Sequence, residues 1–144
     1  LNLASAFRNR FKGHPCRVFM ADMKLRLNIA EDDIFYYPDL LVTCDPADAE
    51  KFYKTRPKVI VEVLSPSTER VDRREKFLSY QRLSSLEDYV LVEQETIRVT
   101  VFSRVNDWKP EHLGSDDFLR LPSVDFEQSV AAIYEDVSES LAQK

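Results

Sequence analysis

A chain of 144 residues has the size of one domain and can bury a core without metal or disulfide support. With 44% hydrophobic residues, 31% charged residues and a net charge of −5, the composition is that of a globular protein and argues mildly against a general nucleic-acid binder. No apolar run approaches the roughly 18 residues that cross a membrane, and no signal peptide or internal repeat is present.

The first third of the chain predicts a helix followed by a hairpin. Apolar residues between positions 3 and 11 fall on one helical face, and Gly13 is a plausible stop for that helix. The alternation of polar and apolar residues from 17 to 29 predicts one half-buried strand. A second strand is predicted from 36 to 44, and its spacing from the first favours a hairpin.

The central part of the chain predicts a buried strand followed by a helix. Residues 58–64 are apolar on both faces, which is typical of a central strand. A helix is predicted from about Glu69 to Leu83, with Thr68 as its N-cap. Further strands are predicted at 87–93, 97–104 and 118–121, and a last helix at 129–137.

This order, α-β-β-β-α-β-β followed by a short strand and a helix, predicts a fold of mixed α/β (α+β) class. We expect a central mixed sheet flanked by helices, in a single domain that spans residues 1–144. Because the first predicted helix starts with the chain itself at Leu1, we also expect a preceding N-terminal segment.

Two cysteines, Cys16 and Cys44, have no Cys or His close enough in the sequence to suggest a zinc site. We expect them to be reduced thiols in a cytoplasmic protein.

A carboxylate inside the sequence VIVEV needs an explanation. Burying Glu62 ionised and without a partner would cost several kcal/mol. Glu62 either pairs with a structural Arg or Lys, or binds a metal together with a second carboxylate. Asp39, which follows a proline in the preceding predicted strand, is the candidate for that second carboxylate. Burial alone does not choose between these alternatives.

Lys76 is the candidate for a cationic partner of these carboxylates. At about 100° per residue, Tyr80 and Leu83 lie within roughly 40° of Lys76 on the helix surface, so Lys76 should lean toward the sheet. The short connection from the Glu62 strand to this helix should bring the ammonium near the carboxylate. The alternative is a surface pair with Asp72, worth about 0.3–0.5 kcal/mol.

Two carboxylates and a lysine suit metal-assisted hydrolysis of phosphodiesters. Carboxylates hold Mg²⁺ or Mn²⁺, and the metal lowers the pKa of a coordinated water and neutralises charge on the phosphate. The lysine can orient the attacking water or stabilise the transition state.

The sequence contains a group of characteristic motifs. They are Tyr37-Pro-Asp39, the sequence VIVEVLSPST at 59–68, Asp72 and Lys76 ahead of Tyr80, EDYVLV at 87–92, and IYEDV at 133–137. These motifs resemble the Uma2 family, also called DUF820, which is assigned to the PD-(D/E)XK superfamily of restriction-endonuclease-like proteins. The EVLSPST stretch is the specific part of this resemblance, which spans about residues 19–137.

The resemblance implies roles for individual residues. Asp39 and Glu62 match the two acidic metal ligands, and the main-chain carbonyl of Val63 matches the usual third metal contact. The lysine expected two residues after Glu62 is absent, because Leu64 stands there, and Lys76 of the helix is the match for it. The glutamate that many members carry on the first helix has no counterpart between residues 1 and 21.

Together these features predict a Mg²⁺- or Mn²⁺-dependent endonuclease that cuts double-stranded DNA, acts in the cytoplasm and forms a homodimer. The alternative is a catalytically degenerate nuclease fold that binds DNA or a protein partner. A third possibility is hydrolysis of another phosphate ester. An Asp22-Met-Lys24 sequence precedes Asp39 instead of following it, so we interpret it as the polar face of a strand. Phosphate contacts are possible for Arg8, Arg10, Lys12, Arg17, Arg70, Arg73 and Arg74.

Overall fold

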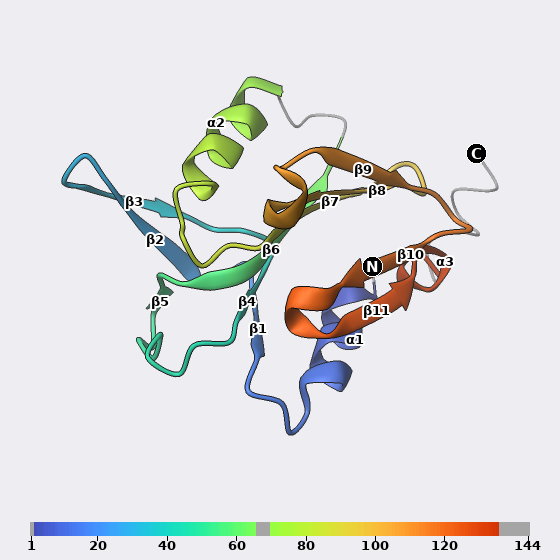
Figure 1. Cartoon of the computed structure of the whole chain (residues 1–144), viewed down its shortest axis with the longest axis horizontal. Coiled ribbons are helices and arrows are strands. Elements are labelled where there is room, and N and C mark those ends of the chain that lie inside the picture. The colour runs from blue at the N-terminus through green and yellow to red at the C-terminus, as the bar shows by residue number, and fades with distance from the viewer. Residues whose placement is uncertain (1, 66–69, 136–144) are drawn as a thin grey trace.

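The computed structural model describes residues 2–65 and 70–135. A six-stranded mixed sheet forms its centre, with the strand order β1-β4-β6-β7-β8-β9 (Figure 1). Strands β6 and β7 are parallel, and the helix between them supplies the crossover that a parallel pair requires. The strands of this sheet are β1 (Arg17–Met20), β4 (Leu40–Thr43), β6 (Pro57–Leu64), β7 (Asp88–Glu93), β8 (Val99–Ser103) and β9 (Pro110–Leu113).

Two smaller sheets flank the central one. The first has the order β3-β2-β5 and the second consists of β10 and β11. Their strands are β2 (Lys24–Ile29), β3 (Asp32–Tyr36), β5 (Tyr53–Lys54), β10 (Phe118–Leu121) and β11 (Phe126–Ser129). The helices are α1 (Leu3–Phe11), α2 (Arg70–Tyr80) and α3 (Val130–Ile133), with 3-10 turns at η1 (Arg104–Asn106) and η2 (Pro122–Val124). Within the described ranges, none of the helices is both long and apolar enough to cross a membrane.

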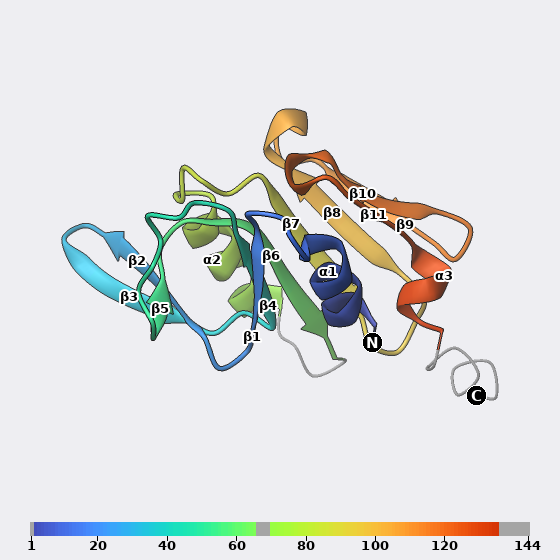
Figure 2. The ribbon, with the colours of Figure 1, turned by 90° about the horizontal axis from the view of Figure 1, so that it is seen from below.

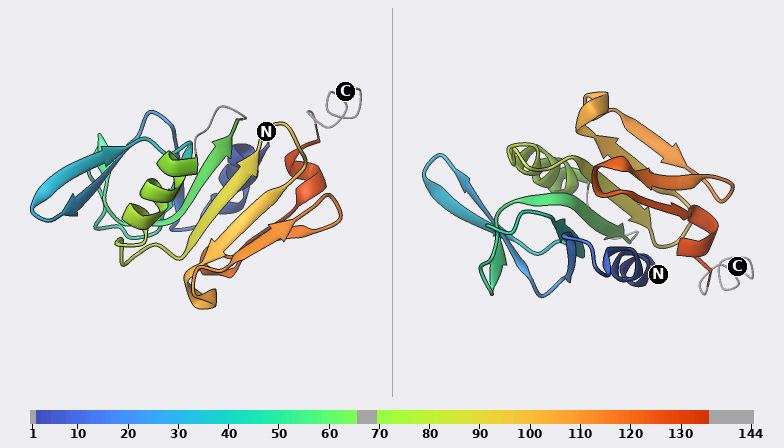
Figure 3. Two further views of the ribbon diagram at one scale, coloured as in Figure 1. Left: turned by 90° about the horizontal axis from the view of Figure 1, so that it is seen from above. Right: turned by 60° about the horizontal axis from the view of Figure 1, so that its bottom comes forward.

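Helices α1 and α2 cover opposite faces of the central sheet. Helix α1 lies in front of the sheet in Figure 2, and α2 lies in front of it when the molecule is seen from above (Figure 3, left). Strand β6 is buried on both faces: Val59 and Val61 join the core beneath α1, while Ile60 and Leu64 join the core beneath α2. Burial on both sides explains the near-continuous apolar sequence of this strand.

The fold class predicted from the sequence is confirmed, because a mixed central sheet flanked by helices is observed. The predicted helix at 3–11 is α1, and the predicted central strand is β6, which lies between β4 and β7. Helix α2 ends at Tyr80, three residues before the predicted Leu83. The predicted cap Thr68 and the predicted start Glu69 lie outside the described residues.

The predicted hairpin of two long strands is wrong. Residues 17–29 form β1 and β2, which belong to different sheets, and residues 36–44 are divided in the same way between the end of β3 and β4. A turn in which Met23 N donates to Met20 O separates β1 from β2. Strand β2 pairs with β3, whereas β1 pairs with β4. The strands β3, β5, β9 and β11 were not predicted, because they are too short or too polar to show a periodicity.

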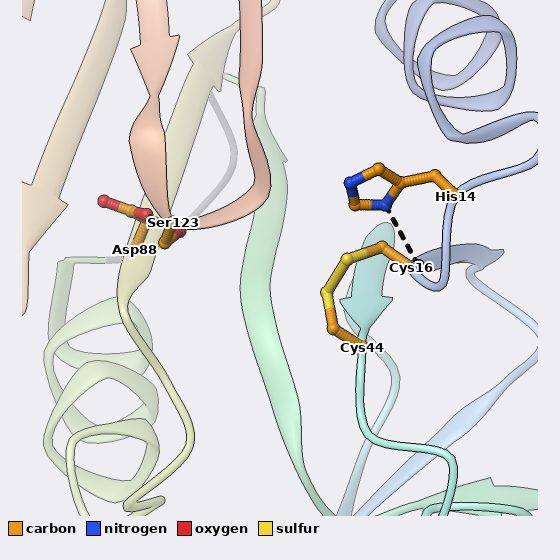
Figure 4. The surroundings of a disulfide bond; sticks show 5 residues. All are labelled: His14, Cys16, Cys44, Asp88 and Ser123. Carbon is orange, nitrogen blue, oxygen red and sulfur yellow. Dashed lines mark hydrogen bonds between the residues drawn. A yellow bond between two sulfur atoms is a disulfide. The ribbon is translucent and has the colours of Figure 1, made fainter.

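The prediction of two reduced thiols is also wrong, because Cys16 and Cys44 form a disulfide (Figure 4). The antiparallel register of β1 and β4 pairs Arg17 with Thr43, so the cysteines occupy the next opposed positions. The backbone N–H of Cys16 also donates to His14 Nδ1 at 3.2 Å. A sequence separation of 28 positions conceals this pairing in the sequence, since only the sheet register brings the two cysteines together.

A buried aspartate connects the C-terminal part of the chain to the central sheet. Asp88 in β7 is 4% exposed, and it accepts hydrogen bonds from Ser103 Oγ at 2.6 Å and Ser123 Oγ at 2.7 Å. Ser123 lies in η2, just before β11, and Figure 4 labels it together with Asp88. These hydrogen bonds stabilise the carboxylate inside the protein.

We expect loss of the disulfide to destabilise the fold. Closing a loop of 28 residues reduces the entropy of the unfolded chain by an amount worth about 3–4 kcal/mol. Reduction, or replacement with Cys16→Ser and Cys44→Ser, should therefore lower the urea midpoint of unfolding. The double variant serves as the control, because reductant should not change its midpoint. An unchanged midpoint in reduced wild-type protein would contradict this expectation.

Candidate active site

The two predicted carboxylates lie opposite each other where β4 begins and β6 ends. Leu40 pairs with Val61 in the antiparallel β4–β6 ladder, and one further step along this register sets Asp39 opposite Glu62. Asp39 Oδ2 accepts a hydrogen bond from the backbone N–H of Val63 at 2.7 Å, which holds the Asp39 side chain against the end of β6. Residues that were 23 positions apart in the sequence are thus brought together by strand pairing.

The side chain of Glu62 is held by two tyrosines. Its Oε1 accepts a hydrogen bond from the Tyr80 hydroxyl at 3.0 Å, and its Oε2 accepts one from the Tyr89 hydroxyl at 3.2 Å. Glu62 is 7% exposed, and both tyrosine side chains are almost completely buried. Tyr80 comes from α2 and Tyr89 from β7, so the helix and the neighbouring strand together fix the position of this carboxylate.

Sequence reasoning did not identify these tyrosines as partners of Glu62. A signal for Tyr80 was present, because the helical phase directs it toward the sheet together with Lys76. Tyr89 gave no such signal, since its proximity to Glu62 depends on the parallel register of β6 and β7, which pairs Glu62 with Leu91.

Burial raises the pKa of Glu62 above its usual range, and the charge of Asp39 acts in the same direction. The positive charge of Lys76 and the hydrogen bonds from Tyr80 and Tyr89 act to lower this pKa. Burial and the adjacent Glu62 carboxylate also raise the pKa of Tyr80, so its hydroxyl stays protonated and remains a donor. The ionised form of Glu62 is therefore supported by three neighbours yet still disfavoured by its buried location.

Lys76 lies in α2, is half-buried, and is close enough to Glu62 for its charge to act on the carboxylate. This is the inward orientation that the helical phase predicts. The alternative, a pair with Asp72, concerns a side chain outside the described part of the structure. The structure therefore brings Asp39, Glu62 and Lys76 into one electrostatic neighbourhood.

The carbonyl of Val63 faces the same place. Gln94 N donates to Leu64 O at 2.8 Å, so the Leu64 carbonyl points toward β7, and the alternation along a strand turns the Val63 carbonyl toward β4. The N–H of Val63 already points that way, since it donates to Asp39. The position opposite Val63 is that of Pro38, which has no N–H to donate. The Val63 carbonyl is thus directed toward the β4 side, where Asp39 lies, without a backbone donor opposite it.

The donors at this place are all oxygens. Two carboxylates and a main-chain carbonyl suit a hard cation such as Mg²⁺, which keeps several of its waters. Nowhere in residues 2–65 and 70–135 do three or more His, Cys, Asp or Glu side chains gather in a way that could hold a metal ion. The residues present therefore fit a hydrated Mg²⁺ or Mn²⁺ better than a metal enclosed by side chains.

A cavity of about 410 Å³ opens beside Asp39. Asp39 and Gln94 supply polar side chains to its wall, while α1 contributes Leu3 and Ala4. The first helix thus lines the cavity with apolar residues, in agreement with the lack of an acidic residue between positions 1 and 21. The cavity gives a bound molecule a path to Asp39 from the α1 side of the sheet.

The other candidate residues have different surroundings. Asp22 lies in the turn between β1 and β2, and Lys24 starts β2 with its ammonium over the Phe35 ring, so the Asp22-Met-Lys24 sequence is on the surface. Arg10 forms an ion pair with Asp125. The Nε of Arg73, one helical turn before Lys76, is buried and has no hydrogen-bond partner among the described residues.

Comparison with solved structures supports the fold. The chain is similar to the crystal structure of "a putative nuclease belonging to DUF820" from Anabaena variabilis ATCC 29413, with a TM-score of 0.75. The match covers 93% of this chain and 76% of that one, and the sequences are 15% identical.

Sequence comparisons identify the family. The chain is 34% identical over 137 residues to "Uncharacterized protein slr1290" of Synechocystis sp. (strain ATCC 27184 / PCC 6803 / Kazusa), a match that covers 93% of this chain and 71% of that protein. It is 36% identical over 93 residues to "Uncharacterized protein sll1609" of the same organism, which covers 62% of this chain and 51% of that protein. The model of the Uma2 family, described as "Putative restriction endonuclease", matches residues 1–132. The chain therefore belongs to the Uma2 family.

Proposed function

We propose that this protein is a metal-dependent endonuclease that hydrolyses phosphodiester bonds of DNA. The observation that carries the proposal is the pair of opposed carboxylates, Asp39 and Glu62, with the charge of Lys76 acting on Glu62. A cavity lined in part by Asp39 gives access to that carboxylate. The description of the Uma2 family as restriction endonucleases supports the same reaction class.

In this proposal Asp39, Glu62 and the carbonyl of Val63 would hold Mg²⁺ or Mn²⁺. When bound, the metal would lower the pKa of a coordinated water and neutralise charge on the scissile phosphate. Lys76 would orient the attacking water or stabilise the negative charge of the transition state. Tyr80 and Tyr89 would keep Glu62 in place for this task, because their hydroxyls donate hydrogen bonds to the carboxylate without contacting the metal themselves.

The substrate and setting are part of the same proposal. Double-stranded DNA is the expected substrate, and a homodimer would let one site per chain cut both strands by symmetry. A cytoplasmic location follows from a DNA substrate, although disulfides such as Cys16–Cys44 are rare in reducing compartments. Thiol-blocking of the protein in intact cells, followed by mass spectrometry, would show which state of the two cysteines exists there.

A degenerate, non-catalytic nuclease fold is the second candidate. Two observations favour it: Leu64 stands where the superfamily has a lysine, and both carboxylate oxygens of Glu62 are already engaged by tyrosines. Each carboxylate oxygen has a second lone pair, so these hydrogen bonds leave room for a metal. Metal binding therefore separates the two candidates.

We expect Mn²⁺ to bind the wild-type protein in isothermal titration calorimetry. Asp39→Ala or Glu62→Ala should weaken this binding at least ~10-fold, because each substitution removes an oxygen ligand. The same variants should lose nicking of plasmid DNA. Glu127→Ala is the matched control, because Glu127 is an exposed carboxylate in β11 paired with Arg120. Equal Mn²⁺ affinity in all four proteins would refute the metal site.

We expect Lys76→Ala to leave Mn²⁺ binding intact and to lower the rate of DNA cleavage roughly 100-fold, the usual effect of removing one transition-state donor. Lys109→Ala, which removes an exposed lysine before β9, should cleave like wild type. Comparing plasmid nicking with turnover of a small phosphodiester distinguishes DNA from other phosphate esters as substrate. Undiminished cleavage by Lys76→Ala would remove Lys76 from the active site.

The raised pKa of Glu62 also predicts an effect on stability. The folded state disfavours the ionised form, so Glu62 lowers stability above its raised pKa, and this penalty disappears below the ordinary value of 4.5, where both states are protonated. Glu62→Gln should therefore stabilise the fold near about pH 7, and this gain should vanish at acidic pH. Thermal melts at neutral and acidic pH measure this. A Glu62→Gln variant that melts below wild type at neutral pH would contradict it.

A further inference from the structure

The outer face of the β3-β2-β5 sheet is not used by the site described above. Alternate residues of β2, among them Leu25 and Leu27, are buried against the core beneath α2. The residues that alternate with them, Lys24 and Arg26, point to the other side. The β2–β3 register pairs Arg26 with Phe35. The hairpin of β2 and β3 extends away from the rest of the molecule (Figures 1 and 3), so this outer face is open to solvent.

Large aromatic side chains are exposed on this part of the molecule. Phe35 is 47% exposed, Tyr37 is 54% exposed, and Phe52, which precedes β5, is 72% exposed. Tyr53 in β5 lies beside Lys24 in the parallel β2–β5 register. Single exposed aromatics are ordinary, but several around one small sheet indicate an interaction surface.

Three of these rings, those of Phe35, Phe52 and Tyr53, have a cation beside them. The Lys24 ammonium lies 5.7 Å from the centroid of the Phe35 ring, the Arg26 guanidinium lies 4.6 Å from that of Tyr53, and the Lys51 ammonium lies 5.5 Å from that of Phe52. Alternating rings and cations match a nucleic-acid strand, whose bases stack on aromatic faces while its phosphates attract Lys and Arg. A second copy of this chain would instead have to bring its own acidic groups to neutralise these cations.

The acidic residues of the hairpin lie at its far end. Glu31 is in the turn that joins β2 and β3, and Asp32 and Asp33 follow at the start of β3. These charges would repel phosphates at the tip. The rings and cations are therefore suited to a DNA strand that crosses the root of the hairpin, where β2 begins and β3 ends, and not its tip.

The root of the hairpin is next to the active site. Tyr37 stands two residues before Asp39, so their Cα atoms are at most about 7 Å apart. Tyr37 directly follows Tyr36, the last residue of β3, and its side chain is exposed. A DNA strand with its phosphate at Asp39 thus has its neighbouring nucleotides within reach of these rings.

We propose that the outer face of the β3-β2-β5 sheet, with Phe35, Lys24 and Arg26, acts together with the exposed Tyr37 just beyond β3 to stack the unpaired bases of a DNA strand beside the cut. The preferred substrate is then DNA with a single-stranded segment adjoining the scissile phosphate, such as a flap, gap or fork. This inference rests on the proposed nuclease function and names the form of its substrate.

The test is binding of a fluorescein-labelled single-stranded oligonucleotide, measured by fluorescence anisotropy in EDTA so that no cleavage occurs. A double variant, Phe35→Ala with Tyr37→Ala, should raise the Kd at least ~10-fold, because losing one stacked base weakens binding by roughly 5- to 100-fold. Phe35→Trp should bind like wild type, since a larger ring still offers a stacking face. Lys24→Gln with Arg26→Gln should weaken binding and reduce its salt dependence.

The matched control is Phe118→Ala. Phe118 is a 43% exposed ring with the Arg120 guanidinium 5.2 Å from its centroid, but it lies in β10, far from the hairpin (Figure 1). This variant should bind the oligonucleotide like wild type. Circular dichroism melts confirm that all variants are folded.

Three outcomes would overturn the proposal: no binding by wild type, equal binding by the Phe35→Ala, Tyr37→Ala variant, or a loss of binding in Phe118→Ala of the same size. A change of sedimentation coefficient in the double variant, with binding unchanged, would assign the face to contact between copies of the chain. Failure of the nuclease proposal is seen separately, as cleavage that is absent or that survives Asp39→Ala. If cleavage depends on Asp39 while the double variant binds and cuts flap DNA like wild type, only the stacking surface is refuted.

Discussion

The structure depends on how a buried carboxylate is accommodated in its central strand. Glu62 lies in β6, the strand that is covered on both faces, and it is 7% exposed. Tyr80 and Tyr89 donate to its two oxygens, and Lys76 adds positive charge. Apolar residues at these positions would pack at least as well, because hydrogen-bonded buried charges seldom add stability over a hydrophobic core. This arrangement is the basis for the proposal that Glu62 binds a metal.

A proline completes this arrangement from the neighbouring strand. Pro38 ends the pairing of β4 with β6, because it cannot donate a backbone hydrogen bond. Beyond it, the Asp39 side chain takes the N–H of Val63 that a longer strand would have used. Pro38 thus lies between β3 and β4, leaves the Val63 carbonyl without a backbone donor and precedes the residue that stands opposite Glu62. The Pro-Asp sequence is short, but it has a physical meaning in this position.

The remaining parts of the molecule support the strands of the central sheet next to Asp39. The disulfide joins the outer strand β1 to β4, and α1 covers the face beneath them. On the other side, the core beneath α2 joins β2 to β6 through Leu25, Leu27 and Ile60. The projecting hairpin is thereby anchored to the strands that carry the carboxylates. Its exposed rings lie outside both cores, which leaves them available for a partner.

The sequence by itself determined the elements whose periodicity is local. Helix α1, the central strand β6 and the strand β10 follow from the spacing of their apolar residues, and Glu62 was conspicuous as an acid within an apolar run. The tertiary structure alone decided which strands pair, since β1 and β2 continue one alternating pattern yet enter different sheets. It also decided that Cys16 meets Cys44 and that Tyr89 meets Glu62. The physical reason is the same in each case: a sheet joins residues far apart in the chain through its register, and register is a property of the packed molecule that no local pattern contains.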